Sequence, residues 1–239
     1  RVRTTPAARA PLPEERPEPE PSLDARFSSF RLQCRDTLAP CPPSVGLLVR
    51  AEHESTQRCT VALVGPDRVI TASHCLRTSE RHAGSRCDDT WIALPHTRSR
   101  AMEWVGCDRV ERADRIDEGS VMRRDVAVLR LRHAVDRPPI LVYAVAPAEG
   151  SIVTVLAVAP HPIYDTQHEL VTRLCRVASE ESAVSTFGRG AERVGWLMEC
   201  PSYPGNSGSP VLDGAGRLRA LVHAGSASVQ GVGVSSGLR

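Results

Sequence analysis

Short apolar runs separated by turn-forming residues recur along the chain from about residue 45 to about residue 235. They are rich in Val, Leu, Ile and Ala, and several alternate apolar with polar positions, which is typical of β-strands. No long stretch has the apolar spacing of a helix. The runs that we expect to form strands are Val45–Arg50, Cys59–Val64, Arg68–Ala72, Trp91–Ala93, Trp104–Val110, the run that begins at Asp125, Ser151–Val158, Leu170–Val177, Gly195–Cys200, Val211–Leu212, Leu218–His223 and Val229–Val234. This pattern predicts an all-β protein.

The beginning of the chain has a different composition. Residues 1–33 are dominated by Pro, Glu and Arg, which favour an extended chain and cannot bury a core. We therefore predict a tail or linker over 1–33 and a folded domain over 34–239. We expect the tail to have tethered the domain to a signal segment or lipid anchor that was removed, with a regulatory pro-segment as the alternative.

Bulk properties narrow the classes of function. The chain has 239 residues, 41% of them hydrophobic, which is enough for one large β domain or two small lobes. The formal net charge is +2 and the arginines are scattered, so no nucleic-acid partner is indicated. No apolar run approaches the roughly 20 residues of a membrane span.

The chain contains eight cysteines and no Cys-x-x-Cys pair. This pattern favours disulfides over a zinc site and therefore an oxidising compartment. We expect a secreted, periplasmic or cell-surface protein. The acidic residues between Asp108 and Glu118 are better explained by a solvated loop than by a calcium site, so we predict neither a metal nor a cofactor.

A candidate nucleophile, Ser207, lies in the segment Tyr203–Pro210. Gly205 and Gly208 let the backbone approach a substrate closely, and the amides of Gly205 and Ser207 could bind a developing oxyanion. A Gly/Ser/Pro cluster on its own usually marks only a turn. A serine nucleophile also needs a base and a group that orients the base.

Two other segments supply those groups. His74 ends the β-type run Val69–Cys75, and Asp125 begins the strand-like run that follows Arg124. Each residue alone could be a core histidine, a strand-end cap or a turn serine. Together, in the order His, Asp, Ser, the three motifs resemble those of the chymotrypsin-like (trypsin-like) serine peptidases. The resemblance extends from about Val45 to about Ser235.

This resemblance implies a fold and a mechanism. The expected fold is two six-stranded antiparallel β-barrels, the first over about 44–137 and the second over about 148–236, with the active site in the cleft between them. The expected catalytic residues are His74, Asp125 and Ser207, with Gly205 and Ser207 forming the oxyanion hole. The expected substrate is a polypeptide, and no oligomeric state is indicated.

The resemblance also bears on the cysteines. Cys59 and Cys75 match the family's disulfide beneath the catalytic histidine. The other expected pairs follow from proximity, and they are Cys34–Cys41, Cys87–Cys107 and Cys175–Cys200.

The sequence departs from trypsin at two positions. The residue before Ser207 is Asn206 rather than aspartate, and no Ile-Val-Gly-Gly-like segment precedes the first strand. We therefore expect activity that does not need an ion pair with a new N-terminus. Pro201 occupies the position of the aspartate that binds Arg or Lys in trypsin, so cleavage after basic residues is not expected. The Gly-Asn-Ser-Gly-Ser form is closest to bacterial glutamyl endopeptidases.

The strand after the serine suggests a different specificity. His223 resembles the histidine with which glutamyl endopeptidases and some viral proteases bind Glu or Gln, and Ser202 matches its helper. The alternative is that His223 is merely buried or solvent-facing and Ala224 shapes a small apolar pocket. Gly225 and Ser226 are expected to pair with the substrate backbone as an added strand.

The sequence therefore predicts a serine endopeptidase that works through an acyl-enzyme and has Glu or Gln before the cut. One alternative is a latent or catalytically silent domain that binds a peptide or protein. Another is an intracellular enzyme switched on by a partner.

Overall fold

The structure is a computed structural model. It describes residues 23, 25–34, 42–52, 55–114, 125–143, 145–161, 163, 166–179, 195–201, 203–226 and 231–235. Within these ranges the chain folds almost entirely as β-structure, as the apolar runs predicted.

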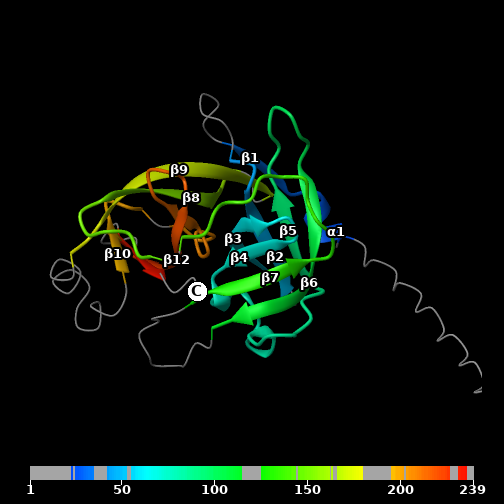
Figure 1. Cartoon of the computed structure of the whole chain (residues 1–239). Helices are drawn as coiled ribbons and strands as arrows, with labels where there is room; N and C mark the ends of the chain where they lie inside the picture. Colours follow the sequence, from blue (N-terminus) through cyan, green and yellow to red (C-terminus); the bar gives the residue numbers. More distant parts are fainter. Residues whose placement is uncertain are drawn as a thin grey trace, which may run out of the picture.

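The first half of the described chain forms a closed antiparallel barrel (Figure 1). Its strands follow one another around the barrel in the order β2-β3-β4-β7-β6-β5. They are β2 (Val45–Glu52), β3 (Ser55–Gly65), β4 (Arg68–Thr71), β5 (Thr90–Leu94), β6 (Glu103–Ala113) and β7 (Ala127–Leu131). Closure leaves no edge among the described strands of this half.

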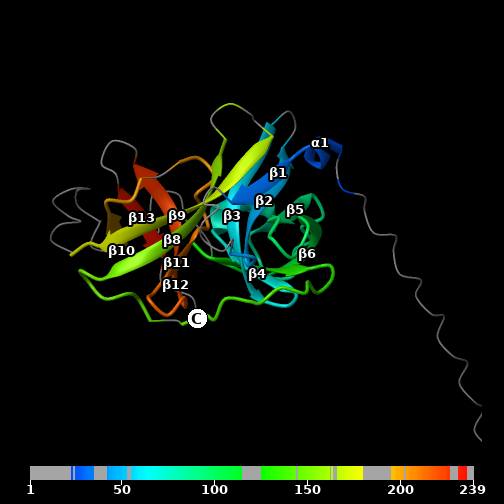
Figure 2. The ribbon, with the colours of Figure 1, turned by 90° about the horizontal axis from the view of Figure 1, so that it is seen from above.

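The second half closes in the same way. The strands run in the order β9-β10-β13-β12-β11-β8, and β8 pairs back onto β9. They are β8 (Ile152–Pro160), β9 (Gln167–Val177), β10 (Gly195–Met198), β11 (Pro210–Leu212), β12 (Leu218–Ser226) and β13 (Gly231–Ser235). The two barrels lie side by side in both views (Figures 1 and 2). The predicted two-barrel fold is confirmed.

Side-chain alternation divides the core into three apolar clusters. On β3, Val61 and Leu63 point into the first barrel, whereas Ala62 faces the second barrel. On β12, Val222 points into the second barrel and Leu221 faces the first. Because successive side chains of a strand point to opposite faces, strands at the junction are buried on both sides. Their sequences therefore read as continuous apolar runs.

The boundary predicted at residue 33 is wrong. Residues 25–34 belong to the folded domain, where they form the short helix α1 (Ala25–Ser28) and the strand β1 (Arg31–Cys34). β1 adds to the second barrel by pairing in parallel with β9. Residues 1–22 lie outside the described residues. Within the described residues no helix has the length and apolar character needed to cross a membrane.

The reason for this difference is a small set of apolar residues in an otherwise polar segment. Phe27, Phe30 and Leu32 are at most 5% exposed and belong to the cluster between the barrels. The ring of Phe27 stacks on Trp104 of β6 at 6.3 Å between centroids, so the segment contacts the first barrel as well as β9. Because the residues before 23 are rich in Pro and Glu, the composition of the N-terminal region did not indicate that these apolar residues pack in the core.

Three disulfides join the pairs expected from the sequence, namely Cys59–Cys75, Cys87–Cys107 and Cys175–Cys200. Cys34 is also disulfide-bonded. Its expected partner, Cys41, lies outside the described residues.

Candidate active site

His74 and Asp125 meet at one end of the first barrel. His74 lies on η1 (Ser73–Cys75), a single 3₁₀ turn that directly follows β4, and Asp125 lies two residues before β7. The Nδ1 atom of His74 is 2.5 Å from Oδ2 of Asp125, and the backbone N–H of His74 donates to Oδ1 at 2.9 Å. The carboxylate thus holds both the ring and the backbone of the histidine.

The two segments that carry these residues are tied to each other. The hydroxyl of Ser73 donates to the backbone carbonyl of Asp114 at 2.7 Å. Asp114 in turn accepts the N–H of Val126 through its carboxylate at 3.1 Å. Neighbouring strands β4 and β7 are paired, which brings residues about 50 positions apart in the sequence together.

Ser207 comes from the second barrel and completes the group. Its Oγ lies 2.7 Å from Nε2 of His74, the ring nitrogen opposite the one that contacts Asp125. The turn that presents it requires glycine at two positions, because Gly205 and Gly208 have φ of 99° and 83°. A side chain at Gly208 would also overlap the backbone carbonyl of Thr60 and the hydroxyl of Thr71. The glycines of the motif are therefore structural requirements of this turn.

Thr60 of β3 connects the serine turn to the first barrel. Its N–H donates to the carbonyl of Ser207 at 2.7 Å, and its hydroxyl donates to the carbonyl of Gly205 at 2.8 Å. The same hydroxyl accepts the N–H of Val158 on β8 at 3.0 Å. Thr60 is fully buried. Sequence reasoning missed this residue, since a threonine in a strand carries no local signal of such a role.

The buried side chain of Asn206 stabilises the serine turn by a hydrogen bond within it. Asn206 is 3% exposed, and its side-chain Oδ1 accepts the backbone N–H of Tyr203 at 3.2 Å. Its own N–H donates to the carbonyl of Tyr203 at 3.1 Å. Among the described residues, the amides of Gly205 and Ser207 donate to no protein acceptor. Two neighbouring N–H groups of the turn are thus available to a bound group.

The electrostatics of the pair favour a charged carboxylate. Burial by itself would raise the pKa of Asp125, which is fully buried. The hydrogen bonds and the charge of His74 outweigh burial, with a smaller contribution from His223, so the pKa of Asp125 is lowered. The His74 side chain is 26% exposed, so part of the side chain remains accessible.

His223 lies on β12 and is 6% exposed. It occupies a β-bulge, because Val222 pairs with Val234 while Ala224 pairs with Gly233. Its Nδ1 is buried without a hydrogen-bond partner. Burial lowers the pKa of His223; the charge of Asp125 opposes this shift and that of His74 adds to it. The ring is therefore neutral at neutral pH.

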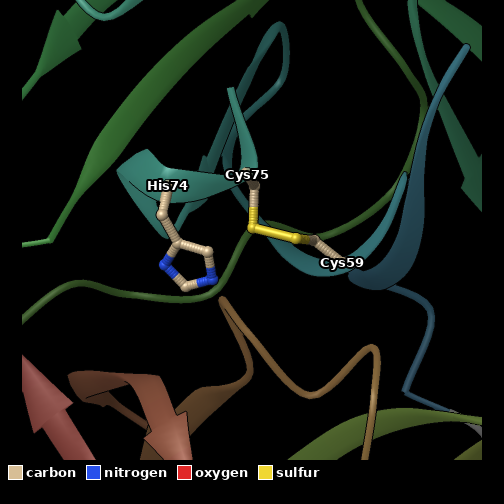
Figure 3. A group of neighbouring side chains, drawn as sticks. All are labelled: Cys59, His74 and Cys75. Atoms are coloured by element: carbon tan, nitrogen blue, oxygen red, sulfur yellow. A yellow bond between two sulfur atoms is a disulfide. The ribbon is translucent and has the colours of Figure 1, made fainter. Parts of the chain in front are cut away.

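Cys59, His74 and Cys75 form the one group in the described chain whose donor atoms are close enough for a metal, within 4.8 Å of one another. Figure 3 shows the imidazole beside the two sulfur atoms, which are bonded to each other. Sulfurs in a disulfide cannot act as thiolate ligands. The group is instead a covalent support for the turn that carries His74.

The other predicted substrate-binding residues are only partly described. Pro201 is half-buried just before the serine turn. Ser202 lies outside the described residues. Ala224, Gly225 and Ser226 continue β12 and pair with β13, and their side chains lie outside the description.

Asp125 and His74 on the first barrel and Ser207 on the second thus form one contiguous group across the junction of the barrels. The model of the family described as "Trypsin-like peptidase domain" matches residues 59–221, which is more than half of the chain. The chain belongs to this family. Comparison with curated protein sequences gives no match.

Solved structures agree on the fold. A scabies mite inactivated protease paralogue, S-D1, has a TM-score of 0.64 at 17% identity and covers 82% of this chain and 88% of its own. Neuropsin, a serine protease expressed in the limbic system of mouse brain, has a TM-score of 0.63 at 17% identity, with 85% and 92% covered. HL collagenase has a TM-score of 0.61 at 17% identity, with 81% and 87% covered. Because these neighbours include an inactivated paralogue, the likeness establishes the fold and not activity.

Proposed function

We propose that this protein is a serine endopeptidase in which Ser207, His74 and Asp125 form the catalytic triad. The observation that carries the proposal is the pair of contacts on opposite nitrogens of His74, 2.5 Å to Asp125 and 2.7 Å to Ser207. A nucleophile, a base and an orienting acid in this arrangement can activate a serine hydroxyl. The disulfides support work in an oxidising, extracellular compartment.

The reaction follows from these positions. Nε2 of His74 takes the Ser207 proton as Oγ attacks the carbonyl carbon of the scissile bond. The oxyanion accepts hydrogen bonds from the amides of Gly205 and Ser207. His74 then donates its proton to the departing amine, which leaves an acyl-enzyme. Water hydrolyses the acyl-enzyme with His74 again acting as the base.

Two further features support the proposal, the first concerning activation and the second concerning substrate binding. Asn206 completes its turn by a neutral hydrogen bond to Tyr203, so this turn requires no buried ion pair. On β12, residues 224–226 pair with β13 along one edge, and no described strand pairs with the other edge. That edge can accept an extended substrate by backbone hydrogen bonds.

For specificity, we propose Glu or Gln before the cut, as in glutamyl endopeptidases. Pro201 supplies no negative charge for a basic side chain. His223 lies on the strand that follows the serine turn and offers an imidazole with a buried, unpaired Nδ1. The alternative within this function is a small apolar pocket beside Ala224.

The test is cleavage of a diverse peptide mixture by the full chain and by Ser207→Ala, with cut sites identified by mass spectrometry. We expect cuts after Glu or Gln that disappear in the variant, since loss of a triad member costs about 10⁴-fold or more in rate. Serine-dependent cuts after other residues would retain the triad and overturn the specificity.

If no serine-dependent cut occurs, the peptide-binding alternative replaces the endopeptidase. The inactivated paralogues among the structural neighbours make this outcome a real competitor. A fluorophosphonate probe gives an independent check, because it labels Ser207 only if His74 activates the hydroxyl.

A further inference from the structure

Arg173 is a charged residue on the inner face of the second barrel. Side chains alternate along β9, and its neighbours on the same face, Val171, Cys175 and Val177, all belong to the apolar cluster inside the barrel. Directly across the ladder it pairs with Val155, another member of that cluster. The residues in between, including Leu174 at 69% exposure, face solvent. Arg173 itself is half-buried, so its stem lies along these apolar side chains.

The charge of Arg173 has no carboxylate partner within the described chain. Its Nε is buried and has no hydrogen-bond partner. The one described contact of the guanidinium is with the ring of Tyr203, whose centroid lies 5.0 Å from Cζ. By contrast, Arg219, another arginine packed on a tyrosine ring, also pairs with Asp213 at 2.9 Å. Arg173 therefore has unused donors.

The contact with Tyr203 places this charge next to the segment that leads into the turn presenting Ser207. Tyr203 is joined to that turn by its hydrogen bonds with Asn206. In the proposed reaction the amides of Gly205 and Ser207 bind the carbonyl oxygen of the scissile bond. The substrate residue before the cut, which carries this carbonyl, therefore lies against the serine turn. Its side chain branches from the Cα atom next to the carbonyl carbon, so it projects from a point close to the segment that contains Tyr203.

We propose that Arg173 determines specificity by binding the side-chain carboxylate of the substrate residue before the cut, so that the enzyme selects acidic residues over Gln. The assignment rests on the proposed endopeptidase function. An Arg–carboxylate pair uses two parallel N–H donors and is stronger than a neutral hydrogen bond, and an amide cannot replace the charge.

His223 alone does not explain a choice between Glu and Gln. Because burial keeps its ring neutral, it can form a hydrogen bond to either side chain. Arginine stays protonated at any pH at which the protein is folded. In this assignment His223 contributes a hydrogen bond and Arg173 contributes the charge.

The first experiment measures binding without catalysis. Two peptides that differ only by Glu or Gln before the expected cut are titrated, at neutral pH, into the full chain carrying Ser207→Ala. We expect the Glu peptide to bind about tenfold more tightly or better, as for a partly desolvated charge pair. Adding Arg173→Gln should reduce this ratio to about one, and Arg173→Lys should restore part of it.

Arg176→Gln is the matched control, because Arg176 lies on β9 but faces solvent. It should leave the ratio unchanged, and thermal unfolding of each variant shows that the barrel is intact. If Arg173→Gln unfolds the barrel, Arg173→Lys alone decides, since a shorter cation should weaken Glu binding several-fold and leave Gln binding as it was. An unchanged Glu/Gln ratio in a folded Arg173 variant, or a ratio abolished by His223→Ala alone, overturns the assignment.

The second experiment separates this inference from the proposed function. The kcat/KM values of the chain with Ser207 present are compared for the same two peptides. Arg173→Gln should lower kcat/KM for the Glu peptide by about tenfold or more and leave the Gln peptide nearly unchanged. Binding selectivity that depends on Arg173 without any cleavage would support the carboxylate site and reject the endopeptidase. Cleavage without that selectivity would do the reverse.

Discussion

At the scale of single residues, the position of the nucleophile depends on a hydroxyl that takes no part in the proposed chemistry. Thr60 donates to Gly205 and accepts from Val158, so one side chain links the serine turn, β3 and β8. His74 and Ser207 come from different barrels, and small displacements between reacting groups have large effects on rate. Thr60 is therefore a positioning residue for the serine turn.

Thr60→Val tests this role. The substitution keeps the shape and strand preference but leaves the Gly205 carbonyl and the Val158 amide without a partner in a buried environment. We expect a loss of about 3 kcal/mol in the free energy of unfolding and a lower kcat, measured by denaturant titration and peptide kinetics.

Thr90→Val is the control. Thr90 is equally buried in the first barrel, but its hydroxyl has no hydrogen-bond partner. Its replacement should be neutral or stabilising. Equal losses in the two variants would show that the Thr60 hydroxyl does no more than fill space.

At the scale of elements, His74 lies on the shortest kind of support, a 3₁₀ turn of three residues between β4 and a loop. Such a turn has few hydrogen bonds of its own. The Cys59–Cys75 disulfide joins it to β3, and Gln57 of the same strand donates to the His74 carbonyl at 3.2 Å. The covalent bond therefore makes the turn part of the barrel wall (Figure 3).

Removing this disulfide in Cys59→Ala/Cys75→Ala should reduce stability by about 3 kcal/mol, the amount typical of a loop of this length. It should also lower kcat about tenfold or more, because His74 is no longer held at the distance that catalysis needs. Cys87→Ala/Cys107→Ala is the matched comparison, since this bridge closes a loop of similar length, 20 residues against 16, away from η1. It should cost similar stability and leave kcat unchanged, and a loss of kcat in both would contradict a local role.

At the scale of the whole molecule, the N-terminal segment packs on both barrels and buries a histidine beneath it. His168 of β9 is 2% exposed, lies opposite Leu32 of β1 and has its ring centroid 5.3 Å from that of Phe30. Burial, followed by the nearby charge of Arg58, lowers the pKa of His168 to about 4. This packing must be broken before the ring meets water.

This packing makes global stability depend on pH. Below about pH 6.5 the unfolded chain protonates His168, whereas the folded chain does so only near pH 4, so the unfolded state binds more protons in between. The free energy of unfolding should therefore fall as pH decreases through this window, by at most about 3 kcal/mol from His168. His168→Leu should flatten that part of the profile, whereas His82→Leu at an exposed site should not. Identical slopes in the two variants would exclude His168 as the source.

The class of fold, the approximate strands and the residues of the proposed triad can all be predicted from the sequence. Strand positions are readable because alternation of side chains is a local property of a few neighbouring residues. Ser207, His74 and Asp125 are readable because each lies in a short motif, and their order along the chain distinguishes the two-barrel peptidases from other serine hydrolases. The glycines beside Ser207 are readable because positive φ is a local demand.

The contacts that join residues across the two barrels are visible only in the folded structure. Thr60 and Gly205 are 145 positions apart, and no local pattern marks the hydrogen bond between them. Arg173 looks like one arginine among many until the barrel places it on an inner face, with no carboxylate partner among the described residues. Residues 25–34 look like the end of a tail until Phe27 and Leu32 meet the surface that the two barrels present. These properties are burial and long-range contact, which arise from closing the barrels and cannot be read from neighbouring residues.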